Sequence, residues 1–276
     1  MPYIHTNTGA RLYYEQQGNG TETIVFSHGL LLNNSMFANQ IDALKKHYRT
    51  IAYDHRGQGN SQIQSPDNSV YDMDTLCEDA ASLIEQLAPK QPVHFVGLSM
   101  GGFVGMRLAA RKPQLLRSLT LLNTSAAAEP QASRRKYALL TIVVKVAGTG
   151  ILANKMMDIM FGRSFLGDDN RQTLRRQWKK HLSNLPKNII QPVKAVFNRL
   201  SVENEISRIS CPVLIIGGTE DKATPPKLSE KIKQLVPHAR LIILEKTGHS
   251  STIEAPQEVT SAIQEFIRSN QIIAIK

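Results

Sequence analysis

Short apolar runs alternate with amphipathic helical stretches along most of this chain. The runs Pro92–Gly97, Leu115–Asn123 and Pro212–Gly217 include stretches such as LTLL and VLII, in which polar and apolar residues do not alternate. This pattern is typical of strands that are buried on both faces, because a strand with one exposed face alternates. Strands that alternate with helices form a mostly parallel sheet covered by helices on both faces. The sequence therefore predicts an α/β fold of this kind.

Other segments fit the same architecture. The remaining expected strands are Thr23–Ser27, Arg49–Tyr53 and Ala239–Leu244, and the expected helices are Met36–His47, Asp74–Leu87, Phe103–Ala110, Pro226–Val236 and Pro256–Arg268. Apolar residues recur at helical spacing in Asp74–Leu87, and a proline opens Pro256–Arg268, where a helix tolerates it.

The segment 129–210 interrupts this alternation and contains no clear strand. It holds three helix-like stretches, Arg134–Val146, Ile151–Phe161 and Arg171–Leu182. We expect residues 1–128 and 211–276 to form the core and residues 129–210 to form a helical cap, or lid. Ligands of open α/β sheets bind at the carboxyl ends of the strands, so the cap is expected over that edge.

The formal charge of +10 is concentrated in the same segment. Residues 131–200 carry 14 Lys or Arg and 3 Asp or Glu residues, a charge of +11, which leaves about −1 for the rest of the chain. Such a surface can attract nucleic acid, anionic lipid or an anionic substrate. Basic residues interleaved with aromatic residues are not present, so a solvated charged face is the simpler interpretation. We expect no nucleic-acid partner.

Cysteine content and hydropathy indicate the compartment. The two cysteines, Cys77 and Cys211, do not suggest a disulfide framework, although the sequence leaves a single bridge open, and a reducing compartment fits best. The first nine residues lack an apolar core of the signal-peptide type. The longest apolar run, around Ala138–Val144, falls far short of the roughly 20 residues that span a bilayer. We expect a cytoplasmic protein without stable membrane insertion, and either a monomer or a homodimer.

The strongest local motif is Gly97-Leu98-Ser99-Met100-Gly101. It fits the pattern G-x-S-x-G and lies between an expected strand and an expected helix, which is the context that this motif requires. The serine must occupy a sharp turn with strained backbone angles, so its neighbours must be small. The N-terminus of the following helix carries positive partial charge that favours an oxyanion.

Further motifs agree with this one in order and spacing. They are His28-Gly29-Leu30, Asp54-His55-Arg56-Gly57-Gln58-Gly59-Asn60-Ser61, Gly218-Thr219-Glu220-Asp221 with Thr224-Pro225-Pro226, and Gly248-His249. With them, the chain resembles the α/β-hydrolase superfamily, and most of all its small esterase, enol-lactonase and haloperoxidase-like branch. The resemblance covers nearly the whole chain except the segment 129–210.

The resemblance implies a catalytic triad. Ser99 is expected to be the nucleophile, His249 the base that accepts its proton, and Asp221 the acid that orients the imidazole. The chain order Ser, Asp, His is that of this fold. Glu220 is the neighbouring competitor for the acid. After the preceding strand, where some members place the acid, this chain has Asn123, which cannot carry the charge.

The same resemblance assigns the oxyanion hole to the backbone N–H groups of Leu30 and Met100. We expect Asp54, Arg56 and His28 to have structural roles. No group of side chains has convincing metal-ligand spacing, and no G-x-G-x-x-G motif opens a helix. The sequence therefore predicts neither a metal nor a cofactor.

The expected function is that of a serine hydrolase, a carboxylesterase or lactonase acting on a small-molecule ester or lactone through an acyl-enzyme. A perhydrolase or haloperoxidase-like enzyme, a carbon–carbon bond hydrolase, and a non-enzymatic ligand receptor with this fold remain alternatives. Met156, Met157, Met160 and Phe161 either line an acyl pocket or pack the cap helices onto the core.

Overall fold

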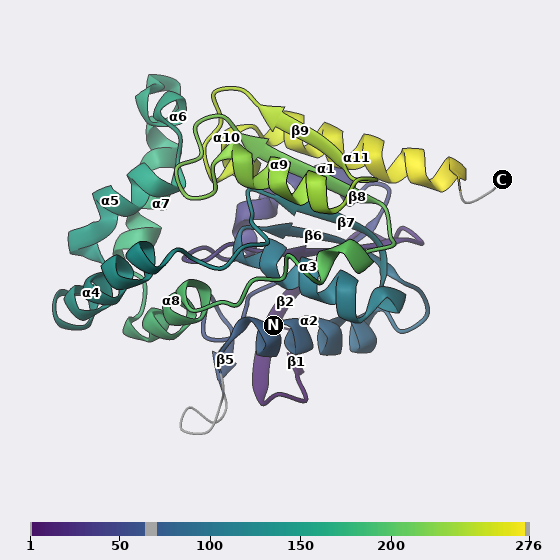
Figure 1. The fold of residues 1–276 in the computed structure, drawn as a ribbon, viewed down its shortest axis with the longest axis horizontal. Coiled ribbons are helices and arrows are strands. Elements are labelled where there is room, and N and C mark those ends of the chain that lie inside the picture. The colour runs from purple at the N-terminus through teal and green to yellow at the C-terminus, as the bar shows by residue number, and fades with distance from the viewer. Residues whose placement is uncertain (1, 64–70, 274–276) are drawn as a thin grey trace.

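A computed structural model describes residues 2–63 and 71–273 of the protein, and a nine-stranded sheet forms its centre (Figure 1). The strands are β1 (Tyr3–His5), β2 (Ala10–Gln17), β3 (Thr23–Ser27), β4 (Arg49–Tyr53), β5 (Gln62–Ile63), β6 (Val93–Leu98), β7 (Leu116–Leu122), β8 (Val213–Gly218) and β9 (Arg240–Leu244). Their order across the sheet is β1-β2-β4-β3-β6-β7-β8-β9, and β5 pairs with β2.

Most of the sheet is parallel. The five neighbouring pairs from β4 through β3, β6, β7 and β8 to β9 are parallel, whereas β2 pairs antiparallel with β1, β4 and β5. The carboxyl ends of β3, β6, β8 and β9 therefore meet at one edge of the sheet. The loops that carry the predicted catalytic motifs follow these four strands.

Both faces of the sheet are buried, as the apolar runs predict. Val25 of β3 and Phe95 of β6 belong to one apolar cluster, which they share with α2 (Met73–Leu87), α3 (Met100–Arg111) and α9 (Pro226–Leu235). Their neighbours in the chain belong to a second cluster with α1 (Ala38–Leu44) and α11 (Pro256–Ile273), because successive side chains of a strand point to opposite faces. Burial of each such side chain contributes about 1.5–3 kcal/mol. The α/β fold class is confirmed.

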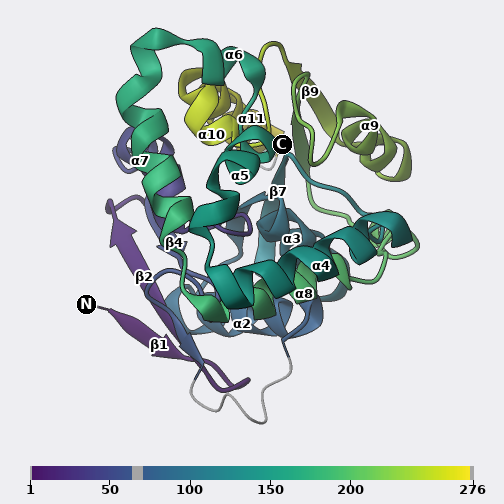
Figure 2. The ribbon, with the colours of Figure 1, turned by 90° about the vertical axis from the view of Figure 1, so that its left-hand side faces the viewer.

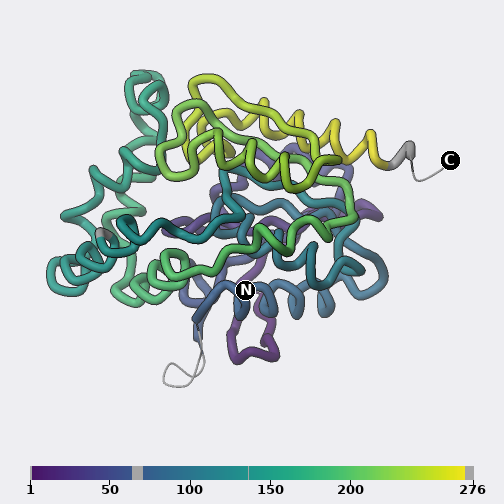
Figure 3. Tube along the Cα trace, viewed as in Figure 1, coloured from purple at the N-terminus to yellow at the C-terminus, as the bar shows by residue number. Residues whose placement is uncertain are grey.

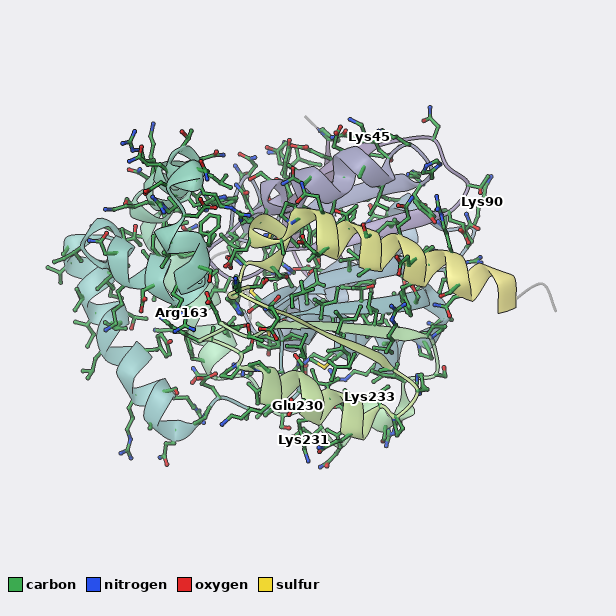
Figure 4. All side chains as sticks on the ribbon, turned by 90° about the horizontal axis from the view of Figure 1, so that it is seen from above. Lys45, Lys90, Arg163, Glu230, Lys231 and Lys233 are labelled. Atoms are coloured by element: carbon green, nitrogen blue, oxygen red, sulfur yellow. The ribbon has the colours of Figure 1, made fainter. Side chains whose placement is uncertain are left out.

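The helical ends follow local signals. Asp72 caps α2, since its carboxylate accepts a hydrogen bond from the Thr75 amide at 2.7 Å. Prolines begin α9 and α11, which agrees with the preference of proline for the first turn. The charged side chains of Glu230 and Lys231 on α9 are exposed (Figure 4). Lys233 instead donates to the carbonyls of Pro237 and Ala239, each at 2.6 Å, just before β9.

Between β7 and β8 the chain leaves the sheet and forms a group of helices before it returns (Figure 3). These inserted helices are α4 (Gln131–Ala147), α5 (Ala153–Met160), α6 (Arg163–Gly167), α7 (Gln172–Ser183) and α8 (Ile190–Phe197). In Figure 2 they face the viewer, with α4 and α8 running side by side. No helix of the described residues is long and apolar enough to cross a membrane.

Several elements were not expected from the sequence. The strands β1, β2 and β5 were missed because they form the antiparallel margin of the sheet, where β2 ends in exposed polar residues. The short helix α6 and the helix α8, which contains Pro192, also lacked a helical signal. The helix expected over Met36–His47 begins as a 3-10 turn at Asn34–Phe37 and continues as α1.

Candidate active site

Ser99 stands at the turn between β6 and α3. Its backbone angles are φ 52° and ψ −109°, a left-handed conformation that residues with a side chain rarely adopt. The turn is held by its backbone, because the Ser99 amide donates to Leu122 O at 2.9 Å and the Thr124 hydroxyl donates to Ser99 O at 2.8 Å. The strained geometry expected of this motif is present, and the surrounding bonds maintain it.

Glycines stand two residues before and two residues after Ser99, where other backbone atoms pass very close. A Cβ atom on Gly97 would lie 2.3 Å from the carbonyl oxygen of Gly101. A Cβ atom on Gly101 would lie 2.0 Å from the carbonyl oxygen of Ser27. The turn therefore has no room for any larger residue at these two positions.

His249 and Asp221 form a hydrogen-bonded pair. His249 lies in the loop between β9 and α10 (Ser251–Glu254), and its Nδ1 is 3.0 Å and 3.1 Å from the two carboxylate oxygens of Asp221. Both side chains are buried, and the opposite ring nitrogen, Nε2, has no hydrogen-bond partner among residues 2–63 and 71–273. The imidazole therefore has the orientation that a general base needs.

The charges of this pair stabilise each other. Burial by itself lowers the pKa of His249, but the nearby charge and hydrogen bond of Asp221 outweigh it, so the pKa is raised. Burial raises the pKa of Asp221, but His249 and the hydrogen bonds from Thr224 and Asn123 lower it overall. The arrangement favours an ionised carboxylate beside a protonated imidazole, which is the state formed when His249 accepts a proton.

Two backbone amides are the candidates for the oxyanion hole predicted from the sequence. Met100 is the first residue of α3, so its N–H has no acceptor within the helix. Leu30 follows β3 in the loop that lines the pocket beside Ser99. The Leu31 amide donates to the Gln58 side chain, whereas neither the Leu30 nor the Met100 amide donates to an acceptor among the described residues.

A pocket of about 360 Å³ contains Ser99 and His249 in its wall. Within the part of the chain that the structure describes, the two side chains share the pocket and no direct hydrogen bond joins them. Most of the remaining wall is apolar and comes from the inserted helices, including Leu140, Val144, Met156, Ile159, Met160, Ile190, Val193 and Val196. The pocket can therefore hold an apolar chain next to Ser99.

A family model described as the alpha/beta hydrolase fold matches residues 22–256. The chain belongs to the α/β-hydrolase fold family. The family predicted from the sequence motifs is thereby confirmed.

Relatives of this α/β-hydrolase are similar over almost their whole length. RutD of Pseudomonas syringae pv. syringae (strain B728a), provisionally named a carbamate hydrolase, is 29% identical over 251 residues, which cover 89% of this chain and 93% of that protein. The uncharacterised hydrolase YugF of Bacillus subtilis (strain 168) is 26% identical over 270 residues, with coverage of 95% and 96%.

Solved structures show the same architecture. A thermophilic esterase from Thermogutta terrifontis has a TM-score of 0.88 and 25% identity, with 98% of each chain covered. The enol-lactonase from Burkholderia xenovorans LB400 has a TM-score of 0.87 and 26% identity, covering 97% of this chain and 100% of that one. The arrangement of sheet and inserted helices in this α/β-hydrolase therefore has close structural counterparts.

Glu254 is a residue of the site that the sequence did not suggest. Its carboxylate accepts hydrogen bonds from the amides of Gly248 at 2.9 Å and Ser250 at 3.0 Å, which are the two neighbours of His249 in the chain. It also accepts the Gly162 amide at 2.9 Å, from the inserted helices. One buried carboxylate thus holds the histidine loop and the inserted helices together. Burial raises the pKa of Glu254.

Asn123 has a supporting role in the same α/β-hydrolase site. Its side-chain amide donates to Asp221 at 2.9 Å and to the Gly248 carbonyl at 3.0 Å. The sequence suggested only that Asn123 lacks charge, and its contact with a carboxylate 98 residues away was not foreseeable. Met156 and Met160 line the pocket, whereas Met157 and Phe161 belong to the apolar cluster beneath it, so both interpretations of these residues apply.

Glu220, the competitor of Asp221, points to a different partner. Its carboxylate accepts hydrogen bonds from the Ser164 amide and hydroxyl at 2.8 and 2.7 Å and from Arg163 at 3.0 Å. Arg163 is the first residue of the inserted helix α6, so this contact joins the inserted helices to the loop after β8 (Figure 4). Among the described residues, Asp221 and not Glu220 bonds the His249 ring.

The residues expected to be structural are buried and bonded to backbone. The His28 ring bridges the Gly29 carbonyl at 2.8 Å and the His55 amide at 2.9 Å, and burial lowers its pKa. Asp54 accepts the Asn34 and Asn60 amides, each at 2.8 Å. These contacts agree with structural roles for His28 and Asp54, next to the site rather than in it.

No cluster of His, Cys, Asp or Glu suited to a metal ion occurs among residues 2–63 and 71–273.

Proposed function

We propose that this α/β-hydrolase cleaves carboxylic esters or lactones with an apolar acyl part, using Ser99, His249 and Asp221 as its catalytic triad. The observation that carries the proposal is the buried His249–Asp221 pair in the wall of the same pocket as the strained Ser99. A glycine would adopt these backbone angles with less strain, so folding alone does not explain a serine at this position. The strain therefore supports a chemical role for Ser99.

The proposed reaction has two steps. The Ser99 Oγ attacks the carbonyl carbon while the Nε2 of His249 accepts its proton, and the amides of Leu30 and Met100 stabilise the oxyanion. The carbon–oxygen bond to the leaving group breaks, and His249 returns the proton to the leaving alkoxide. A water molecule then gives a proton to His249 and attacks the acyl carbon. The bond to Ser99 Oγ breaks, the acid leaves, and His249 returns the proton to Oγ.

We further propose that residues 129–210 form a cap that selects the acyl group. The wall contributed by α4, α5 and α8 is mostly apolar. The charged side chains in the wall include Arg199, which pairs with Glu129 at 3.0 Å, and Lys222, which pairs with Asp158. A third cation of the wall, Lys155, has no ion pair among the described residues. Because two of the three cations are paired and most of the wall is apolar, we propose a neutral apolar acyl chain rather than the anionic substrate that the basic segment also allowed.

The test is hydrolysis of p-nitrophenyl esters of increasing acyl length by the wild type and by Ser99→Ala. We expect steady turnover by the wild type, a loss of about a thousandfold or more in the variant, and an optimum at a medium or longer acyl length. Equal turnover by Ser99→Ala would refute the proposed nucleophile. A matched thermal unfolding midpoint for the two proteins serves as the control for folding.

The same assay separates the remaining candidates. Lactones and a p-nitrophenyl carbamate are added because an enol-lactonase and proteins provisionally named carbamate hydrolases resemble this chain. Formation of a peracid would indicate the perhydrolase, and cleavage of a carbon–carbon bond would indicate the C–C hydrolase. A single slow turnover that ends in a stable adduct would indicate the receptor. The cytoplasmic location and the monomeric or homodimeric state stay predictions.

A further inference from the structure

Helix α4 exposes an unusual row of apolar side chains. Of the six large apolar side chains that the described residues expose to solvent, five lie between residues 139 and 151. Four of these five lie on α4, where Leu139 is 67%, Ile142 59% and Val146 81% exposed. Together with Val143 they follow the spacing i, i+3, i+4 and i+7, so they form one continuous stripe on the outer face of the helix.

The opposite face of α4 is already in use. Tyr137, Leu140 and Val144 line the pocket that contains Ser99. A surface helix normally turns its polar residues outward once its apolar face is buried. Helix α4 has a second apolar face instead, and an exposed apolar patch of this kind is typical of a binding surface.

The charge around the stripe identifies what can cover it. No Asp or Glu occurs between residues 130 and 157, whereas this stretch contains five Lys or Arg residues. Arg135 is exposed and lies one turn before Leu139, and Lys145 is exposed three residues after Ile142. Arg135 therefore lies in line with the stripe at its N-terminal end, and Lys145 flanks it on one side.

We propose that the outer face of α4 docks on a lipid surface that carries anionic headgroups. Apolar side chains flanked by Lys and Arg are the composition of helices that lie in a membrane interface without crossing it. A second copy of this chain is a poorer partner, because it would bring together two segments that each carry a charge of +11. The docked helix lines the pocket with its other face, so the pocket lies directly behind the lipid contact. This inference does not depend on the proposed activity.

The first experiment measures co-sedimentation of the full chain with vesicles of phosphatidylcholine alone or mixed with phosphatidylglycerol. We expect binding to the mixed vesicles, and at least a tenfold loss in the triple variant L139Q/I142Q/V146Q, because glutamine removes the apolar stripe but favours a helix. The matched control is Leu200→Gln, which removes a side chain that is 75% exposed but lies outside the stripe. Leu200→Gln should bind as the wild type does.

A second experiment tests the charge. Arg135→Gln and Lys145→Gln should each weaken binding to the mixed vesicles about fivefold, and added salt should reduce the difference. Circular dichroism melting of every variant shows whether the fold is retained.

The proposal is overturned if the wild type does not bind the mixed vesicles at low salt, or if the triple variant binds as the wild type does. It is also overturned if light scattering shows a dimer that the triple variant abolishes, because a second copy would then be the occupant.

Discussion

The core and the inserted helices differ in where their apolar side chains lie. Strands β6 and β8 are buried at every position, and the glycines at the Ser99 turn leave no free space. The inserted helices place apolar side chains both in the pocket and on the outer surface, and residues 131–200 hold the whole excess of positive charge. The core therefore holds the residues that we propose for the chemistry in tightly packed positions, whereas the inserted helices supply apolar surfaces toward the pocket and toward solvent.

The comparison predicts that a small change in the core costs much and a similar change in the inserted helices costs little. A close-packed turn cannot move without shifting Ser99 or His249. Apolar pocket walls on helices adapt more easily, because methionine and aliphatic side chains can adopt several rotamers. The following four substitutions test this contrast, each with a matched partner.

The largest effect is expected at Asp221. Replacement by asparagine keeps the shape but removes the charge that stabilises protonated His249, so kcat should fall by about 10³–10⁴. Glu220→Gln changes the neighbouring carboxylate, which contacts Ser164 and Arg163, and should alter kcat by less than about tenfold. Steady-state kinetics with one p-nitrophenyl ester measures both. Equal losses in the two variants would mean that the acid has been assigned to the wrong residue.

The next effect concerns stability. In Gly101→Ala the new Cβ would lie 2.0 Å from the Ser27 carbonyl oxygen, so the free energy of unfolding should fall by about 3 kcal/mol or more. Gly167→Ala in α6 meets no atom within 4 Å and should be neutral or raise stability by about 0.5 kcal/mol. Urea unfolding followed by circular dichroism compares them. A tolerated Gly101→Ala would show that the core turn is less rigid than its packing indicates.

Glu254 links the two regions, and its replacement should affect pH dependence. Because His249 must be neutral to accept a proton and its pKa is raised, kcat/KM of the wild type should fall on the acid side at a pH above the ordinary histidine value. Glu254 contributes to that rise, so Glu254→Gln should move the acidic limb to lower pH and reduce kcat/KM about tenfold through misplacement of the loop.

The control for this prediction is Glu258→Gln, an exposed glutamate in the first turn of α11. It should leave the pH profile unchanged. If Glu254→Gln lowered activity without moving the acidic limb, Glu254 would act only by supporting the fold and not on the protonation of His249.

The smallest effect is expected in the pocket wall. Val193→Phe on α8 adds volume inside the pocket, so the preferred acyl chain should become shorter and turnover of long esters should fall about tenfold. Short esters should be hydrolysed as before. Gln191→Phe places the same ring on the exposed side of α8 and should change neither. An unchanged chain-length profile in Val193→Phe would show that the acyl group binds elsewhere.

Much of the fold was predictable because its signals are local. Runs such as Pro212–Gly217 indicate strands buried on both faces, and the glycines around Ser99 indicate the sharp turn. The family follows from these motifs, and the family model confirms it. The polar strand β2 at the sheet margin and the helix α8 with its proline were missed, since tertiary contacts and not local pattern determine them.

The sequence by itself determined the fold class and the family, because both follow from short local motifs in a fixed order along the chain, and it also supplied the residues that we propose for the chemistry. Only the tertiary structure decided that Glu254 holds the loop of His249 to Gly162, a contact across 92 residues. It also decided that α4 is covered on one face and bare on the other. The sequence of a helix that is apolar on two sides cannot tell which side is buried, since burial depends on what the rest of the chain places against it.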